Sequence, residues 1–250
     1  MSPIYTPGKL TLSKSYTAGD SQFSNVQLLL QGNGNTTDSS PSPKTMIAVG
    51  MTTGNPSGSP TPYPASSSSF AQALYFDGST SYLRASATAN SVWDFGATTF
   101  TIEFWIYPSR VNTVQVIAFH GPANSGGGTG GFSSFINASG QVAFDPGTPQ
   151  VFTDLVVSAN VWSHIAYVGN SGTLSAYLNG TKSGSTASYS ITARPSDPLV
   201  IGGYNTQPDN TTATRLFYQG YIDDFRITSN VARYNSSFTA PTAPFPNALY

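Results

Sequence analysis

The sequence has no cysteine, a single glutamate and little charge, and each shortage excludes a class of protein. Without cysteine there is no disulfide framework, no thiolate metal site and no cysteine nucleophile. Charged residues make up 8% of the chain, against roughly 25% in an average soluble domain. The net charge is -1, and no cluster of Lys and Arg is present to neutralise phosphates. A nucleic-acid partner is therefore not expected, and the surface must be kept in solution by Ser, Thr, Asn, Gln and Gly.

Long apolar runs are also missing, so a membrane partner is not expected. The segment Met1–Pro7 has no basic stretch followed by an apolar one and does not resemble a secretory signal. Residues 1–22 contain few large apolar side chains, which predicts an extended N-terminal arm, either disordered or ordered on a larger assembly. Residues 23–250 are expected to form one domain, because all-β sandwiches reach this size as single units.

Short apolar runs rich in β-branched and aromatic residues recur from Val26 onward, separated by turn residues. This pattern is typical of a sandwich, and no window of helical length has a 3.6-residue apolar period. The segment Thr99–Tyr107 is apolar on both faces and should be a central strand covered on both sides. Asn179-Gly180 directly follows an alternating run and predicts a tight hairpin turn. The predicted strands are Val26–Leu30, Thr45–Val49, Ala73–Phe76, Thr99–Tyr107, Val114–Phe119, Phe132–Ile136, Val142–Phe144, Val151–Val157, Trp162–Val168, Thr173–Leu178, Leu199–Ile201 and Tyr221–Ile227, with a single helical turn as a candidate at Ser229–Tyr234.

Several segments, taken in order, resemble the laminin-G-like jelly rolls of the concanavalin A-like superfamily. They are Ala73–Leu83 around Phe-Asp-Gly, Phe95–Ile106, Trp162–Gly180 and Gly220–Tyr234, with Leu28–Leu30 and Asp38–Ser40 similar to the opening strand and turn. The resemblance implies an all-β fold, a two-sheet antiparallel jelly-roll sandwich. The closing run Phe238–Pro246 resembles versions of this domain in bacteriophage tail and capsid-associated proteins, and similar versions occur in bacterial surface proteins.

Catalysis is not expected. Retaining glucanases of this superfamily use two carboxylates about 5 Å apart, in a Glu-x-Asp-x-x-Glu arrangement. Glu103 is the only glutamate, and the apolar run Phe104–Tyr107 follows it, so that pattern cannot be built; only an Asp pair is left open. We expect Glu103 to be a structural carboxylate bonded to a neighbouring strand or to an arginine. His164 should be packed with a satisfied ring nitrogen, and His120, beside a glycine-rich loop, is a candidate for exposure; neither belongs to a recognisable triad.

No cofactor is required, and calcium (Ca2+) is the candidate metal. Hard cations take carboxylate and carbonyl oxygens from loops, and the resemblance implies a calcium site near the rim of such domains. The candidate ligands are Asp77, in the Phe-Asp-Gly turn, and Asp223. On simple alternation Asp223 shares a face with Tyr221 and Phe225, so its carboxylate needs a cation, an arginine such as Arg226, or backbone N–H groups. Structural bonding is the alternative for both carboxylates.

Glycan binding needs aromatic faces for stacking and polar groups for sugar hydroxyls. The loop Gly203–Asn210 supplies both, which makes Tyr204, Asn205 and Asp209 candidate carbohydrate-binding residues. Asn124, in the glycine-rich loop, is added to them.

Two functions follow as expectations. The first is a non-catalytic bacteriophage virion structural protein, a capsid decoration or a tail or fibre component, whose lectin-like domain adheres to host surface polysaccharide. It would be made in the host cytoplasm without a signal peptide and would reach the virion exterior. It would contact other virion proteins through residues 1–22 and form a homo-oligomer, with a trimer inferred from virion symmetry. The alternative is a carbohydrate-binding module or lectin of a bacterial surface protein.

Overall fold

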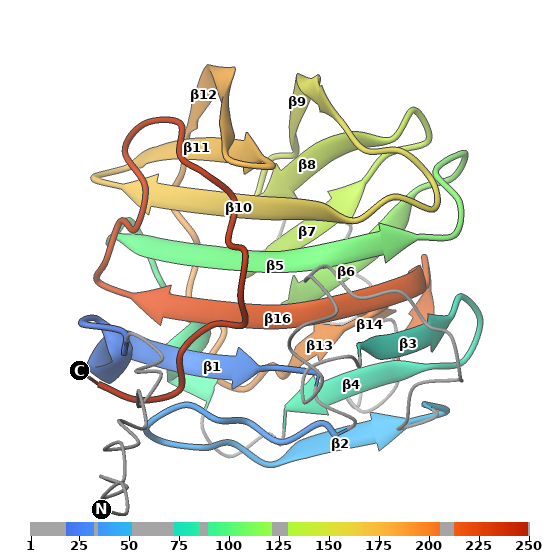
Figure 1. The fold of residues 1–250 in the computed structure, drawn as a ribbon, viewed down its shortest axis with the longest axis horizontal. Helices are drawn as coiled ribbons and strands as arrows, with labels where there is room; N and C mark the ends of the chain where they lie inside the picture. The colour runs from blue at the N-terminus through green and yellow to red at the C-terminus, as the bar shows by residue number, and fades with distance from the viewer. Residues whose placement is uncertain are drawn as a thin grey trace, which may run out of the picture.

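Two antiparallel sheets of seven strands pack face to face in the computed structural model (Figure 1). The structure describes residues 19–32, 35–51, 73–85, 90–121, 130–205 and 213–249. This is the jelly-roll sandwich that the sequence predicted, with side chains alternating between the inner and outer face of each sheet. Within the described ranges, no helix combines the length and the hydropathy needed to cross a membrane.

Sheet A, at the front of Figure 1, has the strand order β1-β16-β5-β10-β11-β12, and β3 pairs with the first half of β16. As predicted, β5 is central and buried on both faces. The bounds are β1 Val26–Leu30, β3 Leu74–Asp77, β5 Phe100–Pro108, β10 Ser163–Asn170, β11 Thr173–Leu178, β12 Thr181–Ser188 and β16 Gln219–Ser229.

Sheet B lies behind sheet A and has the order β2-β4-β13-β6-β7-β8-β9. Its bounds are β2 Met46–Val49, β4 Tyr82–Ala85, β6 Gln115–His120, β7 Phe132–Ile136, β8 Gln141–Asp145, β9 Gln150–Val156 and β13 Leu199–Ile201. A two-stranded ribbon, β14 Tyr204–Asn205 and β15 Ala213–Arg215, and two 3₁₀ turns, η1 Phe23–Asn25 and η2 Asn90–Trp93, complete the described elements.

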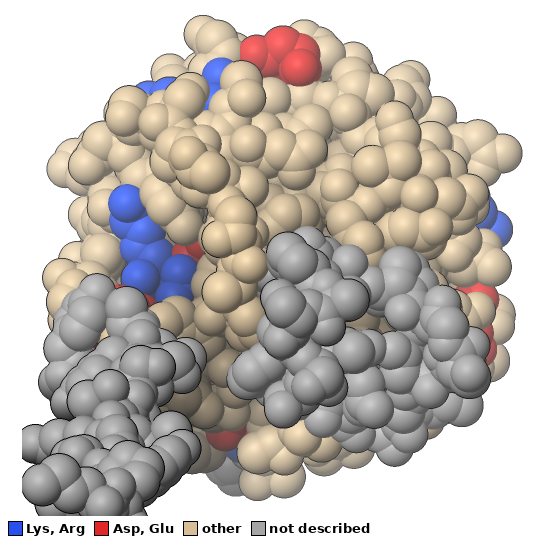
Figure 2. Space-filling view, in the orientation of Figure 1, with Lys and Arg blue, Asp and Glu red and all other residues tan. Residues whose placement is uncertain are grey.

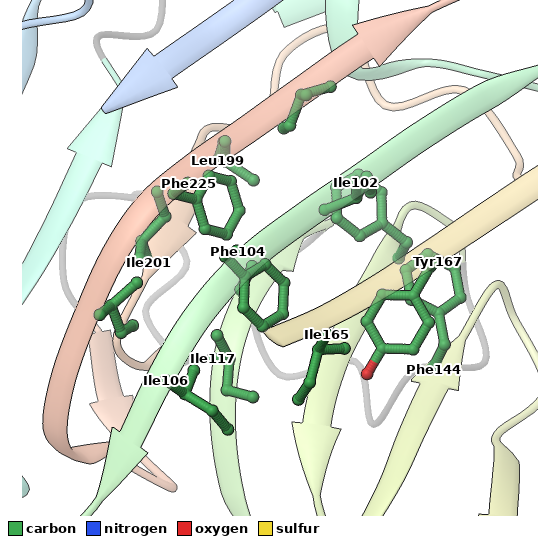
Figure 3. Packing of buried hydrophobic residues seen from close by; sticks show 14 of the residues in the cluster. Ile102, Phe104, Ile106, Ile117, Phe144, Ile165, Tyr167, Leu199, Ile201 and Phe225 are labelled. Atoms are coloured by element: carbon green, nitrogen blue, oxygen red, sulfur yellow. The ribbon is translucent and has the colours of Figure 1, made fainter. Parts of the chain in front are cut away.

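The core lies between the sheets and is rich in aromatic rings. Ile102, Phe104 and Ile106 project from one face of β5 into it and are fully buried (Figure 3). The Phe104 ring stacks on Phe225 of β16, with centroids 5.2 Å apart and planes 3° from parallel. The alternation that places these residues inside directs Glu103 to the outer face of sheet A.

A β-bulge in β16 overturns one expectation from alternation. The register with β5 shifts between Asp223 and Arg226, and Asp224 takes a positive φ of 45°. Because of the extra residue, Phe225 enters the core, whereas Asp223 lies opposite Trp105 on the other face. The prediction that Asp223 and Phe225 share a face was therefore wrong.

The chain's own C-terminal segment, residues 231–249, which we call the strap, crosses part of the outer face of sheet A. In Figure 1 the strap is the dark red chain that crosses in front of β10, β5 and β16. Phe245 is buried, and the Arg226 guanidinium lies 3.8 Å from its ring centroid. Figure 2 shows the same face with few charged side chains. The described chain also begins here, since the Asp20 N–H donates to the Ala248 carbonyl at 2.9 Å.

Local turn chemistry decided several boundaries. Asn179 and Gly180 have φ values of 50° and 80°, which confirms the predicted hairpin between β11 and β12. The segment Ser229–Tyr234 is not helical: Ser229 ends β16, and the strap begins two residues later without regular structure. That expectation was wrong.

Candidate functional site

A groove with a volume of about 510 Å³ opens at one end of the sandwich. This volume falls within the roughly 300–1,000 Å³ typical of ligand sites. Its lining is mostly hydroxyl groups and backbone, with one cation. We call it the rim groove, and its lining residues are Gly130, Pro146, Gly147, Thr148, Ser188, Tyr189, Ser190, Thr192 and Arg194.

One wall of the rim groove is the extended chain after β12, held by long-range hydrogen bonds. The Tyr189 N–H donates to Gly172 at 2.9 Å, and its hydroxyl donates to the Thr98 carbonyl at 2.7 Å. Further along, the Ile191 N–H donates to the Gly96 carbonyl at 2.8 Å. These bonds fix the backbone, so Ser188, Ser190 and Thr192 keep their side chains exposed at the groove.

The opposite wall is the β8–β9 turn. Gly147 has a φ of +118°, a conformation that favours glycine, and its N–H donates to Asp145 Oδ1 at 2.8 Å. The bond turns the Asp145 carboxylate toward the backbone of its own loop. Burial raises the pKa of Asp145, and the Gly147 hydrogen bond offsets only part of that effect.

Arg194 stands at the edge of the rim groove and is held through its backbone. Its N–H donates to Asp94 Oδ1, the oxygen that lies 3.2 Å from His120 Nε2. His120 is fully buried, so its expected exposure was wrong: the side chain faces inward from β6 toward Asp94. The Arg194 Nε is itself buried and has no hydrogen-bond partner among the described residues.

The residues predicted to bind glycan are only partly described. Tyr204 is half-buried on β14, and its ring packs on Phe119 with centroids 4.4 Å apart. Asn205 pairs through its backbone with Ala213. Asp209 and Asn124 lie outside the described residues. The four-residue site stays a prediction, although the Tyr204 ring already has one face against protein.

The first calcium candidate, Asp77, closes its own turn. Its carboxylate accepts hydrogen bonds from the backbone N–H groups of Ser79, Thr80 and Ser81 at 2.8–3.0 Å and from the Thr80 and Ser81 hydroxyls at 2.6 and 2.9 Å. Burial opposes ionisation, but these bonds outweigh it and lower the pKa of Asp77 far below its usual range. Structural bonding accounts for this carboxylate.

The second candidate, Asp223, is buried at the β16 bulge, and its Oδ1 accepts the Asp224 N–H at 3.0 Å. Burial, together with the charge of Asp224, raises the pKa of Asp223 well above its usual value. Arg226 does not pair with it. Across the described part of the chain, no three His, Asp or Glu side chains are close enough to hold a metal ion. Calcium binding at Asp77 or Asp223 stays a prediction.

Glu103 is the centre of a buried ion cluster beneath the strap. Its Oε1 accepts hydrogen bonds from Arg226 Nε at 3.0 Å and Nη2 at 2.7 Å, and its Oε2 accepts one from the Tyr234 hydroxyl at 2.7 Å. Asp20 completes the cluster by accepting from Arg226 at 3.2 Å and from Arg233 at 2.7 Å. Burial disfavours the charge on Glu103, but Arg226, His164 and Arg233 together outweigh it and lower the pKa of Glu103 well below its usual range.

The expectation that Glu103 is structural and bonded to an arginine is confirmed. Its side chain is fully buried, so a substrate cannot reach it while the strap is in place. His164 is also fully buried; its Nε2 lies 3.4 Å from Glu103, yet neither ring nitrogen makes a hydrogen bond within the described chain. The prediction for His164 was right about packing and wrong about the satisfied nitrogen.

Sequence reasoning missed the rim groove. Its residues come from three separate segments, and their side chains are ordinary loop residues when read one by one. One signal was present: the run Ser188–Arg194 alternates hydroxyl and apolar residues and ends in an arginine, in a chain with only 10 Lys and Arg.

Comparison with known proteins adds the following. A laminin-G-type family model, described as the concanavalin A-like lectin/glucanases superfamily, matches residues 77–233. The botulinum neurotoxin serotype D binding domain is similar with a TM-score of 0.55 and 14% identity, over 84% of this chain and 49% of that one. The botulinum neurotoxin serotype C1 binding domain is similar with a TM-score of 0.55 and 17% identity, over 82% and 49%.

Domain 4 of AbnA, a GH43 extracellular arabinanase from Geobacillus stearothermophilus solved in complex with arabinotriose, is similar with a TM-score of 0.53 and 14% identity, over 82% of this chain and 92% of that domain. The chain spans about half the length of the neurotoxin structures. At these identities the structural likenesses show the shared fold alone. No curated protein matches the sequence.

Proposed function

Because the chain belongs to the concanavalin A-like lectin/glucanases superfamily, we propose that it is a non-catalytic domain that binds carbohydrate in the rim groove. The observation that carries the proposal is a groove of about 510 Å³ lined by hydroxyls, backbone groups and one arginine. Such a lining offers hydrogen-bond donors and acceptors to sugar hydroxyls. The complex of AbnA domain 4 with arabinotriose supports it by analogy of fold.

The arrangement of carboxylates supports a role without catalysis. Hydrolysis of a glycoside requires two carboxyl groups facing one substrate. Glu103 is sealed under the strap, Asp145 bonds the backbone of its own turn, and Asp94 bonds the Arg194 N–H and faces His120. None of these three lines the rim groove.

A glycan array, read with and without Ca2+, followed by calorimetric titration of the hits, tests the proposal. Thr192→Val removes a groove hydroxyl with little change in shape, and we expect a loss of affinity of about fivefold, the equivalent of one net hydrogen bond. Thr181→Val is the matched control, because Thr181 is an exposed threonine at the start of β12 and does not line the groove. A blank array, or equal losses in the two variants, would contradict the site.

We further propose that this domain is displayed on the exterior of a bacteriophage virion, as a capsid decoration or a tail or fibre component, and attaches through residues 1–22. The positions of the two edge strands of sheet A support attachment through this arm. The described chain starts beside β1 at one edge, whereas the rim groove lies at the end of β12, which forms the opposite edge. Four strands separate these edges, so attachment at one leaves the other open to host polysaccharide.

Mass spectrometry of purified particles tests the virion location, and light scattering tests assembly as a trimer, which requires three times the 26.3 kDa chain mass. A variant lacking residues 1–18 keeps Asp20 and its ion pairs. We expect it to fold and to bind sugar but to be missing from particles. Incorporation at full occupancy would rule out the arm as the tether.

A further inference from the structure

The rim groove contains a cation whose buried nitrogen is not used by the protein. Arg194 Nε is shielded from solvent and has no hydrogen-bond partner within the described residues. Because Nε is out of reach of solvent, a ligand in the groove would meet the terminal nitrogens of the half-buried guanidinium rather than Nε. The guanidinium lies against Gly130, where a Cβ would come within 2.6 Å of Nε. The absence of a side chain at Gly130 therefore leaves room for the arginine at the groove.

Among the described residues, no carboxylate forms an ion pair with this arginine. Asp94 accepts the Arg194 N–H, Asp145 accepts the Gly147 N–H, and the Asp197 N–H donates to the Arg194 carbonyl at 3.0 Å. None of these three acids lines the groove. The described lining contains no other ionisable group except the Tyr189 hydroxyl, which donates to the Thr98 carbonyl. The groove is thus neutral apart from one positive charge.

We propose that the rim groove selects a carboxylated sugar, of the uronic or sialic acid class, and that Arg194 receives the carboxylate. A guanidinium is planar and matches a carboxylate with two parallel hydrogen bonds. The hydroxyls of Ser188, Ser190 and Thr192 would then meet the hydroxyls of the sugar ring. Because the described lining carries a single arginine, the groove neutralises one carboxylate of the bound sugar. This inference rests on the proposed carbohydrate-binding function.

The test compares acidic oligosaccharides with their own methyl esters, which keep every ring hydroxyl and lose the charge. The probes are oligogalacturonate, oligoglucuronate, alginate oligomers and sialyllactose, each titrated calorimetrically against the full chain. We expect at least one acid to bind about tenfold or more tighter than its ester, because charge-assisted hydrogen bonds are roughly twice as strong as neutral ones. The advantage should shrink as salt rises.

Variants of Arg194 locate the effect. We expect Arg194→Gln to abolish the preference for the acid and Arg194→Lys, which keeps the charge but not the planar fork, to restore part of it. Arg110→Gln is the matched control, because Arg110 is an exposed arginine that follows β5 at the other end of the sandwich. Melting temperatures of all three variants show whether they are folded.

The outcomes separate this inference from the proposed function. If neutral sugars or esters bind as well as the acids, the role of Arg194 is wrong and the carbohydrate-binding function stands. If acids are preferred but Arg194→Gln leaves the preference intact, the acidic site lies elsewhere and the inference is equally wrong. If neither acids nor neutral glycans bind, both proposals fail together.

Discussion

Replacing Glu103 with glutamine tests how far the buried ion cluster supports the fold. Glutamine keeps the shape of the side chain and an oxygen for the Tyr234 hydroxyl, but it removes the negative charge. Arg226 would then retain Asp20 at 3.2 Å, a carboxylate that it already shares with Arg233. Breaking a buried ion pair by removing one partner costs about 3–5 kcal/mol. Because Asp20 remains, we expect the lower end, about 3 kcal/mol of unfolding free energy.

Urea unfolding followed by tryptophan fluorescence measures this change directly. For a domain of this size about 3 kcal/mol corresponds to a melting temperature roughly 6–12 °C lower. Asp154→Asn is the control: Asp154 is exposed, its carboxylate bonds Ser183 and Gly184 at the β9–β12 edge, and we expect a much smaller effect.

The pH dependence gives a second check on the same cluster. The pKa of Glu103 is lower in the folded chain than in the unfolded one. Its contribution is therefore fully present above the unfolded value, near about 4.3, and is lost as the pH falls toward the folded value. The difference between wild type and Glu103→Gln should shrink in acid. A loss under about 1 kcal/mol at pH 7, or a difference that grows in acid, would refute the reasoning.

Three further changes probe the outer face of sheet A. The pKa of Asp223 is raised in the folded chain, so the contribution of Asp223 to the unfolding free energy is present below its unfolded pKa, near about 3.9, and is lost as the pH rises. Asp223→Asn should therefore melt at a higher temperature than wild type at pH 7 but not at pH 3.5. An equal shift of the melting temperature at both pH values would contradict this. At Gly180 a Cβ would lie 1.9 Å from the Phe238 carbonyl of the strap, whereas at Gly172, with the same φ of +80°, it would meet nothing within 4 Å. In urea unfolding, Gly180→Ala should therefore cost at least about 1 kcal/mol more than Gly172→Ala. Equal costs would argue against the contact between Gly180 and the strap. Phe245→Ala removes the ring over Arg226 and should cost about 3–5 kcal/mol in the same assay, so a loss below about 1 kcal/mol would show that the strap packs loosely.

The sheets were predictable where periodicity and turn chemistry agree. The segment that became β5 is apolar at nearly every position, and only a strand covered on both faces can bury such a run. The alternation in β11, followed by Asn179-Gly180, fixed the hairpin in the same way. In contrast β12 was missed, because its residues are small and polar and only Ser183 is buried. Its place at a sheet edge demands little hydrophobicity.

Features that depend on contacts between distant segments were not predictable from one sequence. The bulge at Asp223 and Asp224 reverses the face of every later residue in β16, and no local signal marks the extra position. His120 is a similar case, because its buried ring contacts Asp94, which is 26 residues away in the sequence. The rim groove is assembled from loops, where backbone position rather than residue type determines the surface.

The strap also sets when the domain can be completed during synthesis. Asp20 is among the first residues of the domain to be made, yet its partners Arg226 and Arg233 follow 206 and 213 residues later. Phe245, which covers Arg226, emerges from the ribosome later still. A chain that stops short of it can hold nearly every strand and still present open ionic groups along β5 and β16. The ion cluster between β5 and β16 is therefore covered only after the chain has been made as far as Phe245.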